Sequence, residues 1–176
     1  MDAGLHHVQG KAERVNDLLA LLQEFYRDKL DVLLRHEEGA KLVAEYDVNN
    51  AYQYIINRDE VQLTWLSAAI TELGGAPDRR DDRPNRGASG RGAAAAHGIL
   101  EEDARDAQAF VDRWRPRVEA MTNARHRGML LVILGEMLEQ ERSFEQALAG
   151  RTDLLGRRPE KATPSAGEVL STRWIE

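Results

Sequence analysis

The residues best able to do chemistry are polar side chains set into otherwise apolar helical stripes. In residues 50–73 the positions expected to face inward recur at helical spacing: Tyr52, Ile55, Asp59, Gln62, Leu66, Ala69 and Leu73. Burying a carboxylate and an amide is costly unless they bind each other or a ligand. Asp59 and Gln62 are three residues apart, so both side chains can point at one spot. Their partners are therefore the first functional question.

Two further stretches carry similar groups at similar spacing. Asp103 and Asp106 are three apart, and Glu136 and Gln140 are four apart. Together the inward polar positions predict one cluster in the core, a candidate binding site made of Asp59, Gln62, Asp103, Asp106, Glu136 and Gln140. No Ser-His-Asp pattern and no Gly-rich phosphate loop is present, so we assign no catalytic residue and favour a non-enzymatic role.

The composition excludes several classes of protein. The chain has 176 residues and a net charge of −6, with no long basic run of the kind that binds nucleic acid. It has no cysteine, which excludes disulfides, thiolate metal sites and cysteine nucleophiles. The N-terminus lacks the apolar core of a signal peptide, and the longest apolar run, 129–134, is too short to cross a bilayer. We therefore expect a cytoplasmic protein that binds neither nucleic acid nor membranes.

The apolar periodicity predicts an all-α fold. Apolar residues recur at intervals of three and four, and nothing alternates with period two, so we expect four helices and no strands, in residues 10–36, 50–73, 99–121 and 123–148. Residues 1–9 are expected to be a loose lead-in, and Pro116 should kink or break the third helix. Helix caps are expected at Asp47, Asn49 or Asn50 and at Thr122 or Asn123.

The connections predict how the helices are arranged. Short links join the first helix to the second and the third to the fourth, whereas residues 74–98 separate the two pairs. We expect two antiparallel hairpins joined by a long crossover, forming a bundle over residues 1–150, followed by an extended tail, 151–176. The Gly, Pro, Arg and Asp content of residues 74–98 favours a solvated connection with little fixed structure. The alternative is a mobile arm that orders on a partner or ligand.

The tail also has two interpretations. Its apolar group, residues 169–175, either docks on its own bundle or a partner subunit, or acts as a recognition peptide for another protein, such as a compartment shell.

Over residues 10–149 the layout resembles the ferritin-like superfamily, the rubrerythrin and bacterioferritin type of four-helix bundle. The resemblance implies a di-metal site in which a Glu from one helix and a Glu-x-x-His from the next, repeated twice, hold iron or manganese. The nearest matches here are Asp59-x-x-Gln62 and Glu136-x-x-Glu139-Gln140, and neither contains a histidine. The five histidines lie near expected helix ends, in the lead-in or in the long connection. The metal motif is therefore degenerate.

Three functional hypotheses follow from the residues and the resemblance. The first is a structural or binding protein without an intact di-iron site and without a cofactor, whose polar core is a hydrogen-bonded network with a counter-charge from Arg58, Lys29 or Arg105. The second is a carboxylate-bridged di-metal oxidoreductase or metal-storage protein with iron or manganese between Asp59 and Glu136. The third is a bundle that binds a small polar molecule. We also expect a homodimer, because the last helix has more apolar surface than one core needs, at Leu130, Leu131, Ile133 and Leu134.

Overall fold

The computed structural model describes residues 3–80, 82–84, 86, 93–151 and 153–155, with side chains from residue 13 onward. It contains four helices and, within these residues, no strand: α1 (Ala3–Ala40), α2 (Tyr46–Glu72), α3 (Ala93–Glu119) and α4 (Ala124–Leu148). The all-α prediction is confirmed. No helix in the described part of the chain combines the length and apolar composition needed to cross a bilayer. The predicted tail spans residues 151–176, and 152 and 156–176, which include its apolar group, lie outside the described residues.

The helix boundaries differ from the predicted ones at several ends. The lead-in prediction is wrong from Ala3 onward, because α1 already begins there. The first residue of α2 is Tyr46, and its N-cap, Glu45, makes no side-chain capping bond. Asn49, one of the predicted caps, instead donates from Nδ2 to Ala40 O at 2.8 Å and so satisfies a carbonyl at the end of α1. The predicted caps for α2 are therefore wrong.

Of the predictions for α3 and α4, some are confirmed and others are wrong. The third helix starts six residues earlier than predicted, at Ala93, and continues unbroken through Pro116 to Glu119. The prediction that Pro116 breaks the helix is therefore wrong. The predicted cap Asn123 is confirmed, because its Oδ1 accepts a hydrogen bond from His126 N at 3.1 Å.

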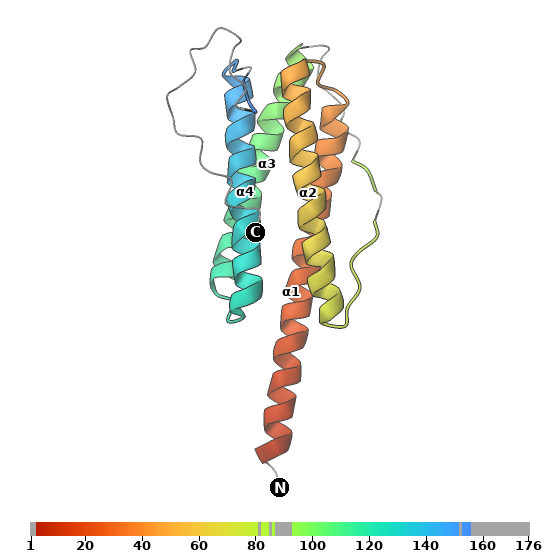
Figure 1. Ribbon diagram of the computed structural model, residues 1–176, viewed down its shortest axis with the longest axis vertical. Helices are drawn as coiled ribbons and strands as arrows, with labels where there is room; N and C mark the ends of the chain where they lie inside the picture. Colours follow the sequence, from red (N-terminus) through yellow and green to blue (C-terminus); the bar gives the residue numbers. More distant parts are fainter. Residues whose placement is uncertain (1–2, 81, 85, 87–92, 152, 156–176) are drawn as a thin grey trace, which may run out of the picture.

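The ribbon in Figure 1 and the contacts between side chains together show the direction in which each helix runs. The end of α1 contacts the start of α2, since His36 lies against Tyr52. Between the two hairpins, α2 opposes α4 through the pair Glu72–Arg125 at one end and Asp59–Gln140 farther along. Helix α2 and helix α3 consequently run in the same direction, with the long connection returning along the bundle.

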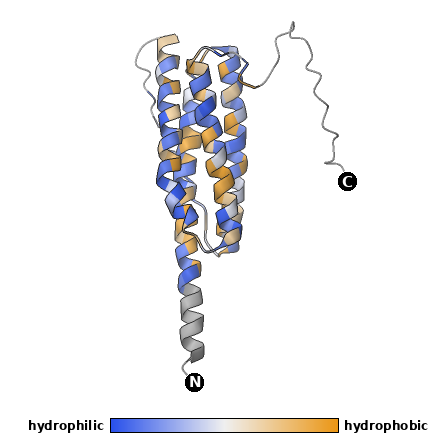
Figure 2. Cartoon of the chain, turned by 90° about the vertical axis from the view of Figure 1, so that its left-hand side faces the viewer, coloured by the Kyte–Doolittle hydropathy of each residue, from blue (hydrophilic) through white to orange (hydrophobic). Residues whose placement is uncertain are grey.

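Apolar side chains form two clusters inside the bundle. The larger contains Phe25, Leu66, Trp114 and Met137 with their neighbours, and the smaller contains Tyr52 and Phe144. Figure 2 shows hydrophobic and hydrophilic residues in turn along α2, α3, α4 and the coloured part of α1, as amphipathic helices around a shared core require.

The burial of residues in α4 removes most of the evidence on which the homodimer prediction was based. Leu130, Ile133 and Leu134 are buried in their own bundle, and only Leu131 of the four residues proposed as excess apolar surface is exposed. That argument for a homodimer is therefore wrong for three of its four residues.

The long connection has far more fixed contacts than predicted. It follows α1, where Gln23 Nε2 donates to Ala76 O at 3.1 Å, and Arg80 and Arg83 form ion pairs with acids of α1. A third arginine, Arg86, reaches the backbone of α1 at Arg35 O. The three arginines are three residues apart along the chain, and all three contact α1. Over its described residues, the prediction of little fixed structure is wrong.

Candidate functional site

The centre of the bundle is a buried carboxylate with three polar partners. Asp59 is fully buried, and Lys29 Nζ lies 2.6 Å from its Oδ1. His36 Nδ1 lies 2.8 Å from its Oδ2, and Gln140 Nε2 donates to Oδ1 at 2.7 Å. The Lys29 ammonium also lies 3.0 Å from the sulfur of Met137. We call Lys29, His36, Asp59 and Gln140 the central cluster.

The central cluster joins helices from both hairpins. Lys29 and His36 are seven residues apart and so lie on one face of α1, two turns from each other. Asp59 comes from α2 and Gln140 from α4. Lys29 contacts the larger apolar cluster at Met137, and His36 contacts the smaller at Phe144, so the polar centre lies between the two clusters.

The electrostatics favour an ionised Asp59. Burial raises the pKa of this carboxyl, but the nearby Lys29 charge and the hydrogen bond with His36 outweigh burial and lower the pKa to about 2. A charge buried this deeply is tolerated only with a counter-charge and satisfied lone pairs. Lys29 supplies the charge, and three polar contacts satisfy the two oxygens.

Gln62 and Glu136 form a second group beside the central cluster. Gln62 Nε2 donates to Glu136 Oε2 at 2.7 Å, and Arg58 Nε donates to the same oxygen at 3.0 Å. Arg58 also pairs with Oε1, which makes the contact bidentate. Gln62 is fully buried, whereas Arg58 and Glu136 are half-buried. This second group opens toward a surface pocket.

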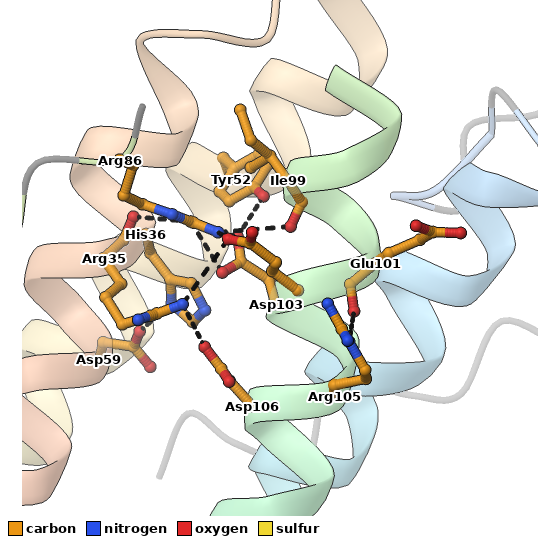
Figure 3. A network of polar contacts seen from close by, with 11 residues as sticks. Arg35, His36, Tyr52, Asp59, Arg86, Ile99, Glu101, Asp103, Arg105 and Asp106 are labelled. Carbon is orange, nitrogen blue, oxygen red and sulfur yellow. Dashed lines mark hydrogen bonds and ion pairs between the residues drawn. The ribbon is translucent and has the colours of Figure 1, made fainter. Parts of the chain in front are cut away.

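Asp103 belongs to a third group around the long connection (Figure 3). Tyr52 Oη donates to Asp103 Oδ2 at 2.5 Å, and Arg86 Nη1 lies 2.8 Å from Oδ1. Burial, with the adjacent Asp103 charge, raises the pKa of Tyr52, so this phenol stays protonated and donates. Arg86 is itself buried and reaches its partners past Gly39, where an added Cβ would lie 2.7 Å from Nη1. The third group thus ties the connection to α1 and α3.

The structure divides the predicted cluster of six residues into separate contacts. Asp59 meets Gln140, and Gln62 meets Glu136, so four of the six residues lie together in two pairs. Asp103 lies with Tyr52 and Arg86 instead, and the half-exposed Asp106 pairs with Arg35 at 2.5 Å. The six residues therefore do not form one site.

Of the three predicted counter-charges, Lys29 and Arg58 meet core acids. Lys29 pairs with Asp59 and Arg58 with Glu136. The hydrogen bond described for Arg105 goes to a backbone oxygen of its own helix, Glu101 O, so its predicted role is wrong.

Sequence reasoning missed His36 and Arg86. His36 was placed near a helix end, but α1 continues to Ala40 and His36 is buried. A signal was present, because Leu22, Lys29 and His36 follow one another at heptad spacing on the buried face. Arg86 lies in a stretch without periodicity, and its buried partner Asp103 is 17 residues away, so no local pattern indicated it.

The central cluster does not fit the di-metal centre that the resemblance implies. An ammonium group already occupies Asp59 Oδ1, and a metal ion there would face its positive charge at short range. The second family position, Glu136, is held by Arg58 and Gln62. Among the described residues, no three histidine, aspartate or glutamate side chains come together as a metal site would require. For iron, an amide oxygen is also a poorer ligand than the imidazole of the family's motif.

Comparison with known proteins gives no family for this chain. No protein-family model matches it, and no curated protein matches its sequence.

Proposed function

We propose that the chain is a ferritin-like helical bundle in which an ion-paired centre replaces the di-metal site, and that it has a structural or binding role. The two hairpins, the long crossover and the central Asp59 support the ferritin-like part of this proposal. The contact of Lys29 with Asp59 supports the second part, which is that an ion pair replaces the di-metal site.

The observation that carries the proposal is the contact between Lys29 Nζ and Asp59 Oδ1, at 2.6 Å with both side chains fully buried. In a di-metal bundle, metal ions neutralise the inward carboxylates. Here Lys29 neutralises Asp59 from within the chain, and Arg58 does the same for Glu136. The acids are thereby held without an exchangeable cation, which suits a scaffold better than a redox centre.

Metal analysis tests this proposal directly. Protein expressed in medium supplemented with iron and manganese and purified without chelator should contain well below one equivalent of either metal. The matched variant is Asp59→Ala with Glu136→Ala, whose metal content should equal that of the wild type. Stoichiometric iron or manganese in the wild type, lost in the double variant, would support the oxidoreductase or metal-storage hypothesis instead.

A pocket favours small-molecule binding as a second candidate function. It has a volume of about 240 Å³ between α2 and α4, and its lining includes Tyr54, Arg58, Glu136 and Gln140. The Oε1 atom of Gln140 is buried and has no hydrogen-bond partner among the described residues, so a donor group could bind there. Native mass spectrometry of freshly purified protein tests this, since a bound ligand adds a fixed mass that Gln140→Leu should remove. An unchanged protein mass under conditions that preserve the fold would count against it.

A further inference from the structure

Arg86 is a buried cation that comes from the long connection, but the groups that bind it belong to α1 and α3. Its side chain is 5% exposed. Nη1 donates to Arg35 O at 3.1 Å and to Asp103 Oδ2 at 2.9 Å. Nη2 donates to Glu102 Oε2 at 2.9 Å and lies 3.5 Å from Ile99 O. Figure 3 shows the guanidinium group reaching between the two helices. We call these four acceptor groups the Arg86 slot.

Helices hold the acceptors of the Arg86 slot independently of the connection. Arg35 O and Ile99 O are backbone atoms of α1 and α3. The buried Asp103 side chain accepts a hydrogen bond from Tyr52 Oη of α2 at 2.5 Å, which fixes its orientation. Groups that are positioned by packed helices hold their geometry more precisely than groups on loops. The slot is therefore preorganised by α1, α2 and α3.

A glycine of α1 leaves the space that the guanidinium group occupies. At Gly39 an added Cβ would lie 2.7 Å from Arg86 Nη1 and 3.2 Å from Ile99 Cγ2. Both distances are too short for an unstrained contact. Gly39 belongs to α1, where glycine is less favourable than alanine. The close approach of the guanidinium group thus gives this position a steric reason to be glycine.

The slot suits a guanidinium group better than an ammonium group. Its acceptors are divided between two nitrogens, since Nη1 serves Arg35 O and Asp103 whereas Nη2 serves Glu102. A guanidinium group places its donors in a fixed planar fork, whereas an ammonium group is a single point charge. The hydrogen bond from Arg86 lowers the pKa of the Glu102 carboxyl, so this acid is ionised at neutral pH. The contacts described for the buried Asp103 include no cation other than Arg86.

We propose that α1, α2 and α3 form a binding site for a guanidinium group, that Arg86 fills this site as an intramolecular ligand, and that the site binds the guanidinium group of a separate molecule when Arg86 is replaced. The acceptors, the space at Gly39 and the hydrogen bond that orients Asp103 all belong to the helices. The site therefore persists without its resident side chain. It shares no residue with the central cluster, so it is independent of the proposed function.

The first experiment measures ligand binding to folded Arg86→Ala by isothermal titration calorimetry. Ethylguanidinium is the probe, because it is the part of the arginine side chain that alanine lacks. We expect a millimolar dissociation constant for Arg86→Ala and no binding to the wild type, whose slot is filled. Ethylammonium should bind at least about tenfold more weakly, since the loss of one charge-assisted hydrogen bond corresponds to a factor of that order. Equal affinity for the two cations, or no binding of ethylguanidinium to Arg86→Ala, would overturn the proposal.

The matched control closes the slot without changing any charge. Adding Gly39→Ala to Arg86→Ala sets a methyl group within 2.7 Å of the position that Nη1 occupies, and alanine favours the helix there. This double variant should bind ethylguanidinium at least about tenfold more weakly than Arg86→Ala and keep its helical circular dichroism. Equal binding by the two proteins would place the probe elsewhere and contradict the proposed site.

A third variant keeps the buried cation and changes only its shape, so the proposal stays testable if Arg86→Ala does not fold. Arg86→Lys retains a positive charge beside Asp103 but lacks the fork that also reaches Glu102. Its unfolding equilibrium constant, measured with urea, should rise at least about tenfold. Arg80→Lys is the control, because the pair of Arg80 with Asp31 is exposed, and should change this constant by less than about threefold. If Arg86→Lys is as stable as Arg80→Lys, the slot requires only a charge and the proposal is wrong.

Discussion

Removing the charge of Asp59 while keeping its shape should strongly destabilise the protein. The substitution Asp59→Asn leaves the Lys29 ammonium fully buried without a counter-charge. Breaking a buried ion pair by removing one partner costs about 3–5 kcal/mol, because the remaining charge cannot be solvated. The contacts with His36 and Gln140 are also weakened, since both now meet a neutral amide. We expect a loss at the upper part of that range.

The companion substitution Lys29→Met makes it possible to distinguish the energy of the ion pair from that of the other contacts of Asp59. Methionine fills a similar volume beside Met137 and removes the buried cation. Asp59 then keeps only His36 and Gln140, so Lys29→Met alone should also destabilise by several kcal/mol. In the double variant Lys29→Met/Asp59→Asn neither charge is left unpaired. Its loss should be smaller than the sum of the single losses by at least about 2 kcal/mol.

Urea unfolding followed by circular dichroism at 222 nm measures these differences. With a slope of about 2 kcal/mol per molar urea, a 4 kcal/mol loss lowers the midpoint by roughly 2 M. Glu136→Gln is the matched control, because it neutralises a carboxylate whose pair with Arg58 is half-buried and should cost only about 1 kcal/mol. A loss below about 1 kcal/mol for Asp59→Asn, or additive single effects in the double variant, would refute the ion-pair account of the centre.

Three further predictions follow. The pKa of Asp59 is lowered from 3.8 to about 2, so its contribution of about 2 kcal/mol is complete above pH 4 and is lost as the pH falls through 2; the urea-unfolding difference between wild type and Asp59→Asn should shrink by that amount between pH 5 and 2. Arg86→Ala leaves Asp103 buried without its cation, so it should cost about 3–5 kcal/mol and speed tryptic cleavage after Arg79 and Arg80, whereas unchanged cleavage would show that Arg86 does not anchor the connection. Asn123→Ala removes the cap of α4 and should cost about 1 kcal/mol, whereas Asn123→Ser should largely restore it.

Local periodicity was sufficient to predict the helices and the depth of two polar residues. The apolar spacing on α2 required Asp59 and Gln62 to face inward, and both are fully buried. The sequence has four amphipathic stretches and no period-two alternation, so the pattern predicted an all-α fold. These features depend on residues within a few turns of each other, which is the range that a sequence pattern reports.

The partners of the polar residues depended on tertiary geometry. Lys29 lies 30 residues from Asp59 and was one of three candidate counter-charges, so their contact was one of several possible pairings. Asp103 has the same inward spacing as Asp59 yet lies in a different group, because Arg86 enters from a connection that has no periodicity. The apolar spacing of a helix predicts which residues face inward. The partner of an inward residue depends on how far neighbouring helices are shifted along the bundle axis relative to each other.

Polar contacts between the hairpins also explain why the relative height of the two hairpins along the bundle axis is well defined. Apolar side chains can slide past one another by a turn at modest cost, whereas Glu24 pairs with Arg117, and Arg58 with Glu136, at one relative height of the helices. A shift of one turn, about 5.4 Å, would separate Asp59 from Gln140 and leave an oxygen of a buried carboxylate short of a donor. The Asp59–Gln140 contact therefore favours one alignment of the two hairpins, because a shift leaves an oxygen of the buried carboxylate without its amide donor while the Lys29–Asp59 pair stays within its own hairpin.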